Sequence, residues 1–128
     1  MRSNLLTSAS GYNTAAPPPI RLLLQTDRYA VVAKPAGTVV HRNKFSPEGE
    51  VPLLQRVRDL TGRHVHAVHR LDGGTSGCVL FAFDSEMTAM LQQAMRDECA
   101  SKTYLAMVRG DASAIRDQTV ERDRKSVV

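Results

Sequence analysis

One carboxylate, Asp72, lies in the stretch of the chain with the strongest chemical character, HRLDGGTSG at residues 69–77. Arg70 precedes it by two positions, and three glycines follow it within five. Glycine permits positive φ angles and close approach of a ligand to the backbone, while Thr75 and Ser76 offer hydroxyls for turns. The pattern predicts that Asp72 is presented on a tight loop between two strands. An aspartate followed by two glycines is also a common turn former, so a purely structural role stays open.

Two more stretches accompany this loop in a fixed order, VAKPAGTVVH at residues 32–41 and KTYLAMVRG at residues 102–110. Together, the three motifs resemble the RluA-type pseudouridine synthases, a family in which the aspartate of the HRLD motif is the essential catalytic residue. The resemblance covers about residues 20–110. Within the family, VHR at residues 40–42 and VRDLTG at residues 57–62 are similar to the branch that acts on tRNA. The resemblance therefore implies an RNA pseudouridine synthase whose substrate is tRNA or, as a second choice, rRNA.

The resemblance also implies substrate-binding roles for five side chains: Arg70, Tyr104, His69, Lys34 and His41. Arg70 would contact RNA around a flipped-out nucleotide, and Tyr104 would pack on the face of the uracil ring. Simpler roles stay open for each. Arg70 could instead pair with Asp72 and lower the pKa of that carboxyl, and Tyr104 could be an ordinary half-buried strand tyrosine. Lys34 and His41 could be solvated surface residues.

The implied reaction breaks the N-glycosidic bond of uridine, turns the uracil ring and joins its C5 to the same sugar. It includes no redox step, so we expect no cofactor. One carboxylate can serve either as a nucleophile on the sugar or as a proton carrier for the detached base, and the sequence leaves both roles open for Asp72. A stacked base must first be flipped out of the folded RNA.

Two other site chemistries are disfavoured by residue type and spacing. His64 and His66 alternate on a predicted strand and so share one face, but no Cys, Asp or Glu at ligand spacing accompanies them, so no metal is expected. A small hydrolase that uses Asp72 with His69 would need an oriented nucleophile and base, which the spacing does not suggest.

Composition favours a small intracellular protein with a polyanionic partner. The chain has 128 residues, enough for one small domain. Its net charge of +4 and pI near 9.4 suit RNA. Cys78 lies in an apolar run, which predicts a buried reduced thiol. No apolar run approaches the ~20 residues of a membrane span, so we expect a soluble cytoplasmic protein; the acid-free N-terminus also suits an organellar transit peptide.

The predicted elements form an α/β fold of the α+β type, with a mixed, mainly antiparallel sheet and packed helices. Strands are predicted at residues 20–25, 29–33, 38–41, 77–83 and 102–109, and helices at residues 52–61 and from Ser85 onward. Pro52 and Gly62 suit the two ends of the first helix, and Asp84 or Ser85 suits the N-cap of the second. The methionines of the second helix recur at helical spacing and predict core packing.

Residues 1–19 are rich in Ser, Thr, Ala and Pro and predict a disordered tail. Residues 20–128 are expected to be the N-terminal portion of a catalytic domain, because family members continue with a TGRxHQ segment and a basic residue that pairs with the catalytic aspartate. Such a domain would be monomeric when complete. The alternative to an active synthase is an inactive remnant or an RNA-binding module. Residues 111–128 show no clear period.

Overall fold

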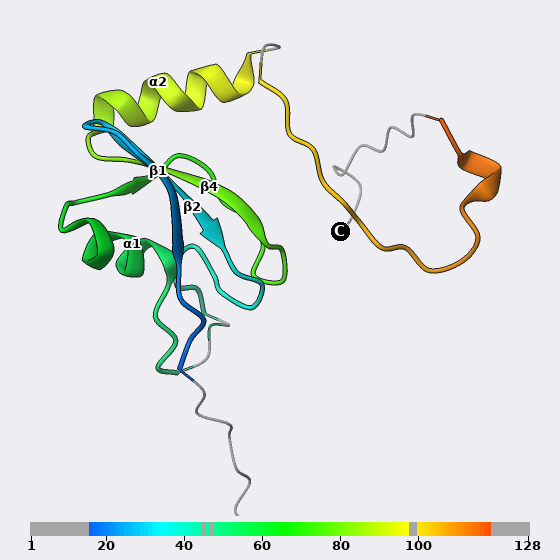
Figure 1. Cartoon of the computed structure of the whole chain (residues 1–128), viewed down its shortest axis with the longest axis horizontal. Helices are drawn as coiled ribbons and strands as arrows, with labels where there is room; N and C mark the ends of the chain where they lie inside the picture. Colours follow the sequence, from blue (N-terminus) through cyan, green and yellow to red (C-terminus); the bar gives the residue numbers. More distant parts are fainter. Residues whose placement is uncertain (1–15, 45, 47, 98–99, 119–128) are drawn as a thin grey trace, which may run out of the picture.

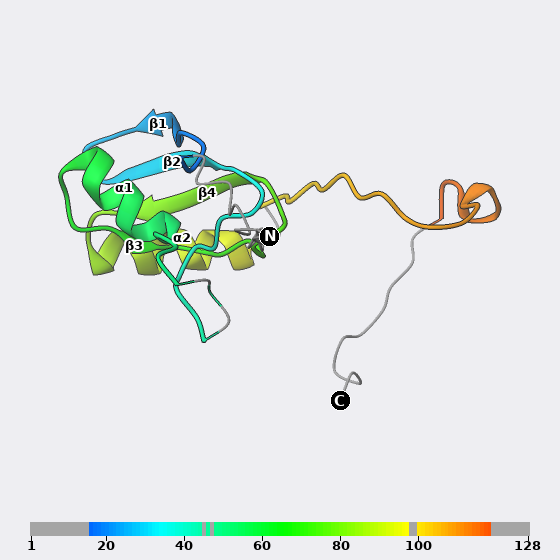
Figure 2. The same cartoon turned by 90° about the horizontal axis from the view of Figure 1, so that it is seen from below.

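The computed structural model describes residues 16–44, 46, 48–97 and 100–118. Its strands form one antiparallel sheet in the order β1-β2-β4-β3. The elements are β1 (Arg21–Gln25), β2 (Tyr29–Lys34), α1 (Leu53–Thr61), β3 (His66–Ala67), β4 (Gly77–Ala82), α2 (Ser85–Arg96) and the 3₁₀ turn η1 (Ser113–Ile115). The two α-helices lie on opposite faces of the sheet (Figures 1 and 2). The predicted α+β fold, with a mainly antiparallel sheet and packed helices, is confirmed, and all strand pairs of the described residues are antiparallel.

The core lies between α1 and one face of the sheet. Alternate residues of a strand point to the same face, and in β2 the buried set begins with Ala30 and Val32. Val79 and Phe81 of the neighbouring strand β4 are also fully buried. These side chains join Leu53 and other residues in a single cluster of buried apolar groups. The central strands β2 and β4 therefore form the packed part of the sheet from which the functional loops extend.

Helix α1 begins and ends where the sequence predicted. Pro52 precedes its first residue, and Gly62 ends it with a left-handed φ of 65°. Leu53 and Val57 are fully buried against the sheet. Leu60 is 51% exposed, although its spacing from Leu53 and Val57 puts it on the same face of the helix. Only the first two turns of α1 therefore contribute to the core.

Helix α2 covers the opposite face of the sheet much less completely. Its N-cap is Asp84, whose Oδ1 accepts a hydrogen bond from the Met87 N–H at 2.6 Å. The helix contacts β3 and β4 but has no buried residue, and Met90 is 53% exposed. The prediction that its methionines pack in a core is wrong. The expected buried thiol is also wrong, because Cys78 is exposed beside a hollow between β4 and the last turn of α2.

Two predicted strands are absent from the described part of the chain. Residues 38–41 form a loop, because the carbonyls of Val39 and Val40 accept hydrogen bonds from the first two N–H groups of α1 at 2.8 and 3.1 Å. Residues 102–109 are extended but unpaired, and they run away from the sheet in the yellow and orange part of Figure 1. Leu105 and Met107 are fully exposed there. The predicted strand is therefore wrong for the described part of the chain, where every residue of this stretch is exposed and no strand pairs with it.

The described residues include only the end of the predicted N-terminal tail. Residues 16–19 are exposed and irregular, whereas residues 1–15 lie outside the described part. The Pro18 carbonyl accepts a hydrogen bond from the Arg56 side chain. Among the helices of the described residues, none is long and apolar enough to cross a membrane.

Candidate active site

Asp72 lies on the loop that connects β3 to β4, as the glycine pattern predicted. A turn forms at this residue, because its carbonyl accepts a hydrogen bond from the Thr75 N–H at 3.0 Å. Gly77 closes the loop with a φ of +143°, a conformation that side-chain-bearing residues rarely adopt. Gly73 packs closely, since a Cβ atom at this position would lie 3.4 Å from Cγ1 of Val39. The loop therefore presents an exposed carboxylate from a tightly packed base.

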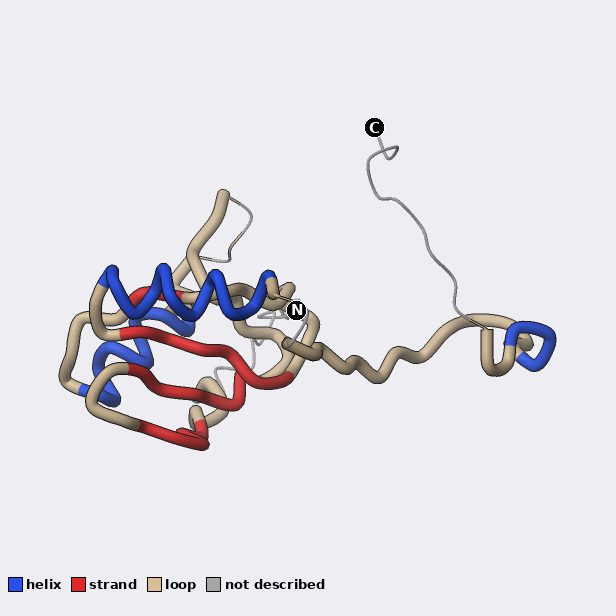
Figure 3. The backbone as a smooth tube through the Cα atoms, turned by 90° about the horizontal axis from the view of Figure 1, so that it is seen from above, coloured by secondary structure: helices blue, strands red, loops and turns tan. Residues whose placement is uncertain are grey.

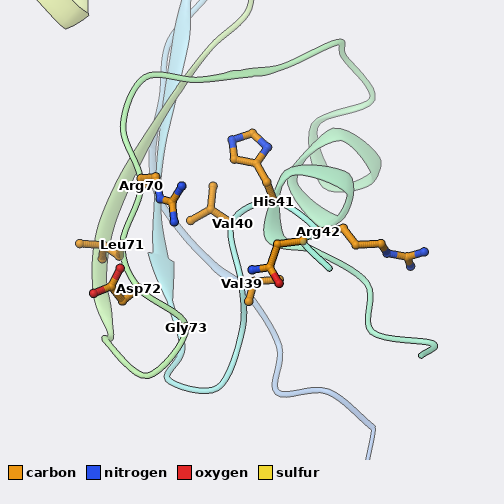
Figure 4. Close-up of a pocket in the computed structure, with 9 residues that line it drawn as sticks. Val39, Val40, His41, Arg42, Arg70, Leu71, Asp72 and Gly73 are labelled. Carbon is orange, nitrogen blue, oxygen red and sulfur yellow. The ribbon is translucent and has the colours of Figure 1, made fainter. Parts of the chain in front are cut away.

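A hollow of about 270 Å³ separates this loop from residues 39–43. Figure 4 shows its two walls, with Arg70 and Asp72 on the backbone of one and His41 and Arg42 on the other. Arg42 also donates a hydrogen bond to the Glu50 carbonyl at 2.8 Å. Among the described residues, no hydrogen bond or ion pair engages the Asp72 carboxylate, so the alternative in which Arg70 pairs with it is not observed there. Three of the predicted site residues, Arg70, Asp72 and His41, thus line one hollow.

Lys34 is buried beneath the Asp72 loop, with 1% of its surface exposed. Its Nζ donates hydrogen bonds to the carbonyls of Pro35 at 3.0 Å, Thr38 at 2.5 Å and Gly73 at 3.0 Å. The Gly73 carbonyl also accepts the Gly37 N–H at 2.8 Å. Lys34 therefore joins the turn after β2 to the Asp72 loop. The alternative in which Lys34 is a solvated surface residue does not hold.

The electrostatic surroundings of this lysine are acidic. Burial lowers the pKa of Lys34, and the negative charges of Asp72 and Glu50 oppose that shift. Glu50 accepts a hydrogen bond from the Val39 N–H at 3.3 Å through Oε1, while its Oε2 is buried and has no partner among the described residues. Sequence reasoning did not single out Glu50, because nothing in its local pattern shows that its side chain returns to the backbone of Val39, which lines the hollow.

Tyr104 and His69 line a second hollow, of about 720 Å³, on the other side of Leu71. Tyr104 is 61% exposed and does not line the hollow that contains Asp72. The imidazole of His69 is half-buried, and its Nε2 accepts a hydrogen bond from the Leu80 N–H at 3.2 Å. Burial lowers the pKa of His69, a backbone hydrogen bond with Arg70 opposes the shift, and nearby Lys102 adds to it. The described chain thus brings Tyr104 to His69 and not to Asp72.

The paired histidines of the sequence do lie together. The rings of His64 and His66 meet edge to face, with their centroids 4.7 Å apart. Within the described residues, no group of three or more His, Cys, Asp or Glu side chains is placed to hold a metal ion.

Comparison with known proteins identifies the class to which this fold and loop belong. The model of the RNA pseudouridylate synthase family matches residues 28–127. The chain therefore belongs to the RNA pseudouridylate synthase family, and the resemblance inferred from the three motifs is confirmed.

Among individual relatives, tRNA pseudouridine synthase C of Pectobacterium carotovorum subsp. carotovorum is 38% identical over 108 residues, which cover 84% of this chain and 29% of the relative. The enzyme of the same name from Haemophilus influenzae is 40% identical over 91 residues, covering 71% of this chain and 38% of the relative. The chain thus spans about a third of the length of these relatives. A solved structure of human RNA pseudouridylate synthase domain containing 4 aligns over 59% of this chain, with 29% identity and a TM-score of 0.45.

Proposed function

We propose that this chain supplies the Asp72 side of an RNA pseudouridine synthase active site and that its substrate is a uridine in structured RNA, tRNA before rRNA. Asp72 is the catalytic residue, acting on the sugar or on the detached uracil. The observation that carries the proposal is the exposed carboxylate of Asp72, which has no partner among the described residues and lies on a loop within the region matched by the family. The names of the relatives favour tRNA as the substrate.

The arrangement of charges around the hollow supports this assignment. Arg70 lines the same wall of the hollow as the exposed Asp72, and Arg42 lies on the opposite wall, where its guanidinium donates to the Glu50 carbonyl. Guanidinium groups bind phosphate through several donors at once, so they suit the backbone of an RNA strand. Asp72 can then meet the ribose and uracil of a nucleotide flipped out of the stack. Arg70 and His41 are the side chains best placed for RNA contact, while Lys34 acts from below as a positioning residue.

Two predicted site residues stand differently in this proposal. Tyr104 would reach the uracil only if residues 102–105 moved toward the first hollow, so its stacking role stays a prediction. The hydrolase alternative finds no support, because Nε2 of His69 is engaged by the Leu80 N–H and the imidazole borders the other hollow.

The decisive experiment measures the release of tritium from C5 of labelled uridine in a tRNA transcript. It uses the 128-residue chain and the same chain extended by the portion of the Haemophilus influenzae relative that lies beyond the matched region. We expect turnover by the extended chain and little or none by the short one, because the short chain spans only about a third of the length of the relatives and so supplies one side of the active site. Asp72→Asn should lower turnover at least about a thousandfold, because an amide can neither attack the sugar nor accept the proton.

Asp59→Asn is the matched control, because Asp59 is an exposed aspartate of α1 whose contact is Arg58. This variant should retain turnover, and both variants should retain RNA binding. Undiminished tritium release by the Asp72→Asn chain would remove Asp72 from the mechanism. RNA binding without any release by the extended chain would favour the alternative, an RNA-binding module.

A further inference from the structure

The backbone leaves the sheet just after β3, and the last rung between β3 and β4 is only half made of backbone. The last regular pair is Ala67↔Phe81. At the next pair, Val68 and Leu80, the Val68 N–H donates to the Leu80 carbonyl at 3.0 Å. A regular antiparallel rung would return the Leu80 N–H to the Val68 carbonyl. That return bond is replaced on both sides by side chains.

Each half of the missing bond has its own substitute. The Leu80 N–H donates to Nε2 of His69 at 3.2 Å. The Val68 carbonyl accepts a hydrogen bond from Nε2 of Gln92, on α2, at 3.3 Å. Buried backbone groups without partners are strongly unfavourable, so the two side chains allow the strand to separate from β4 without leaving an orphaned donor or acceptor.

The separation determines where the Asp72 loop goes. Beyond His69 the chain crosses toward the end of β2, where the Gly73 carbonyl accepts hydrogen bonds from Gly37 and Lys34. The loop is therefore held at one end by Lys34 and at the other by the substituted rung. Figure 3 shows α2, the source of Gln92, running beside the strands from which this loop departs.

We infer that His69 is a positioning residue whose neutral imidazole, together with Gln92, replaces the missing backbone hydrogen bond. The two side chains thereby fix the point at which the chain that carries Arg70 and Asp72 leaves the sheet. This assigns His69 a role other than substrate contact. Its importance for catalysis rests on the proposed function, whereas the replacement of the rung does not.

The role requires the uncharged imidazole, because a protonated ring has two N–H donors and no acceptor. The titratable groups that line the hollow with His69 are the Cys78 thiol of β4 and the side chains of Lys102 and Tyr104, while α2 contributes the uncharged Met95. No carboxylate of the described residues lines this hollow to favour protonation. Burial and Lys102 both lower the pKa of His69 and so favour the accepting form.

The first test measures amide hydrogen exchange at Leu80 by NMR in the 128-residue chain. His69→Phe should speed exchange at this amide by about tenfold, because the acceptor is lost. His69→Gln should restore the protection, since its side-chain oxygen can occupy the place of Nε2 and cannot be protonated. The matched control is His66→Phe, because His66 is a half-buried histidine of β3 outside the rung, and exchange at Leu80 should not change. Equal effects of the two phenylalanine variants would overturn the inference.

The second test needs no variant. The ¹⁵N spectrum of the wild-type imidazole should show a proton on Nδ1, none on Nε2 and a coupling between Nε2 and the Leu80 amide nitrogen. A proton on Nε2 at neutral pH would overturn the inference, whatever the variants do.

The third test is a pH series of the Leu80 protection factor. The pKa of His69 is lower in the native state than in the unfolded chain, where it is about 6.5. As the pH falls, the unfolded chain therefore binds the proton first. The stability contributed by the rung is therefore present above that pH and is lost as the pH falls toward the native pKa. Protection should decline over that window in the wild type and stay flat in the His69→Gln chain. An identical decline in both would assign the pH effect to another group.

Turnover of the extended chain separates this inference from the proposed function. His69→Phe should lower kcat more than it changes KM, and His69→Gln should recover kcat. If no chain releases tritium but the NMR tests succeed, the proposed function fails and the rung stands. If the wild type turns over but exchange at Leu80 ignores His69, the rung fails and the proposed function stands.

Discussion

β4 and residues 102–109 have similar apolar, strand-forming sequences but opposite surroundings. β4 is hydrogen-bonded on both sides and fully buries Val79 and Phe81. The second stretch has no paired strand among the described residues, and Leu105 and Met107 are fully exposed. β-propensity describes a side chain that fits a pleated, half-buried surface, so it specifies a strand only where a neighbour supplies that surface.

The predicted site residues are divided between the packed region and the exposed segment. Asp72 and Arg70 stand on a loop that is held by Lys34, buried at its base. Tyr104 belongs to the exposed segment formed by residues 100–118, all of which are exposed. The position of the carboxylate therefore depends on the core, whereas no packed element of the described residues holds Tyr104 in place.

The largest expected difference between the two regions is in proteolysis. Trypsin should cleave after Lys102 and Arg109 at least about a thousandfold faster than after Arg58 or Arg70. Cleavage in the exposed segment needs little local opening, whereas cleavage in α1 or the Asp72 loop needs much of the core to open. Mass spectrometry of a timed digest of the 128-residue chain gives the rates.

The same digest, run on the extended chain, tests whether the added polypeptide covers the exposed segment. In the extended chain, cleavage after Lys102 should slow to the rate of the core sites if the added polypeptide pairs with residues 102–109. Equal cleavage rates at all four sites in the short chain would contradict the division between the two regions.

The next effect is on stability and compares two lysines. Lys34→Met should lower the free energy of unfolding by about 3 kcal/mol, because three carbonyls lose a charged donor in a buried site. Lys102→Met should change it by less than about 0.5 kcal/mol, because Lys102 is exposed in the other region. Urea unfolding, followed by circular dichroism, measures both values. A small effect at Lys34 would mean that its three hydrogen bonds are not what holds the Asp72 loop in place.

Local sequence rules predicted the parts of the fold whose causes are local. Gly62 ends α1 and Asp84 caps α2 because each satisfies backbone groups within a few residues of itself. The loop position of Asp72 likewise followed from its neighbouring glycines. These features need no knowledge of the rest of the chain.

The features that the sequence did not predict depend on distant partners. Lys34 is buried because its Nζ reaches the Gly73 carbonyl, 39 residues away. Gln92 reaches Val68 across 24 residues, and no pattern in α2 marks it. Residues 38–41 have high strand propensity, but the carbonyls of Val39 and Val40 accept hydrogen bonds from the first N–H groups of α1 instead of from a neighbouring strand. Such exchanges are decided by tertiary packing, which periodicity does not record.

The smallest effect sharpens the comparison at single glycines with unusual backbones. Gly77 closes the Asp72 loop at a φ of +143°, and Gly110 lies in the exposed segment at a φ of +99°. Gly77→Ala should lower the free energy of unfolding by about 1–2 kcal/mol, because alanine is strained at that φ and the packed loop cannot relax. Alanine is also strained at the φ of Gly110, but Gly110→Ala should leave the unfolding free energy unchanged, because its segment can shift without disturbing the core.

A third variant, Gly74→Ala, tests space alone, since nothing lies within 4 Å of its added Cβ and its φ is not in the positive range. It should be neutral or stabilising by a few tenths of a kcal/mol, because it restricts the unfolded chain. Urea midpoints of the three variants decide the matter, and equal losses at Gly77 and Gly110 would show that the exposed segment folds together with the sheet.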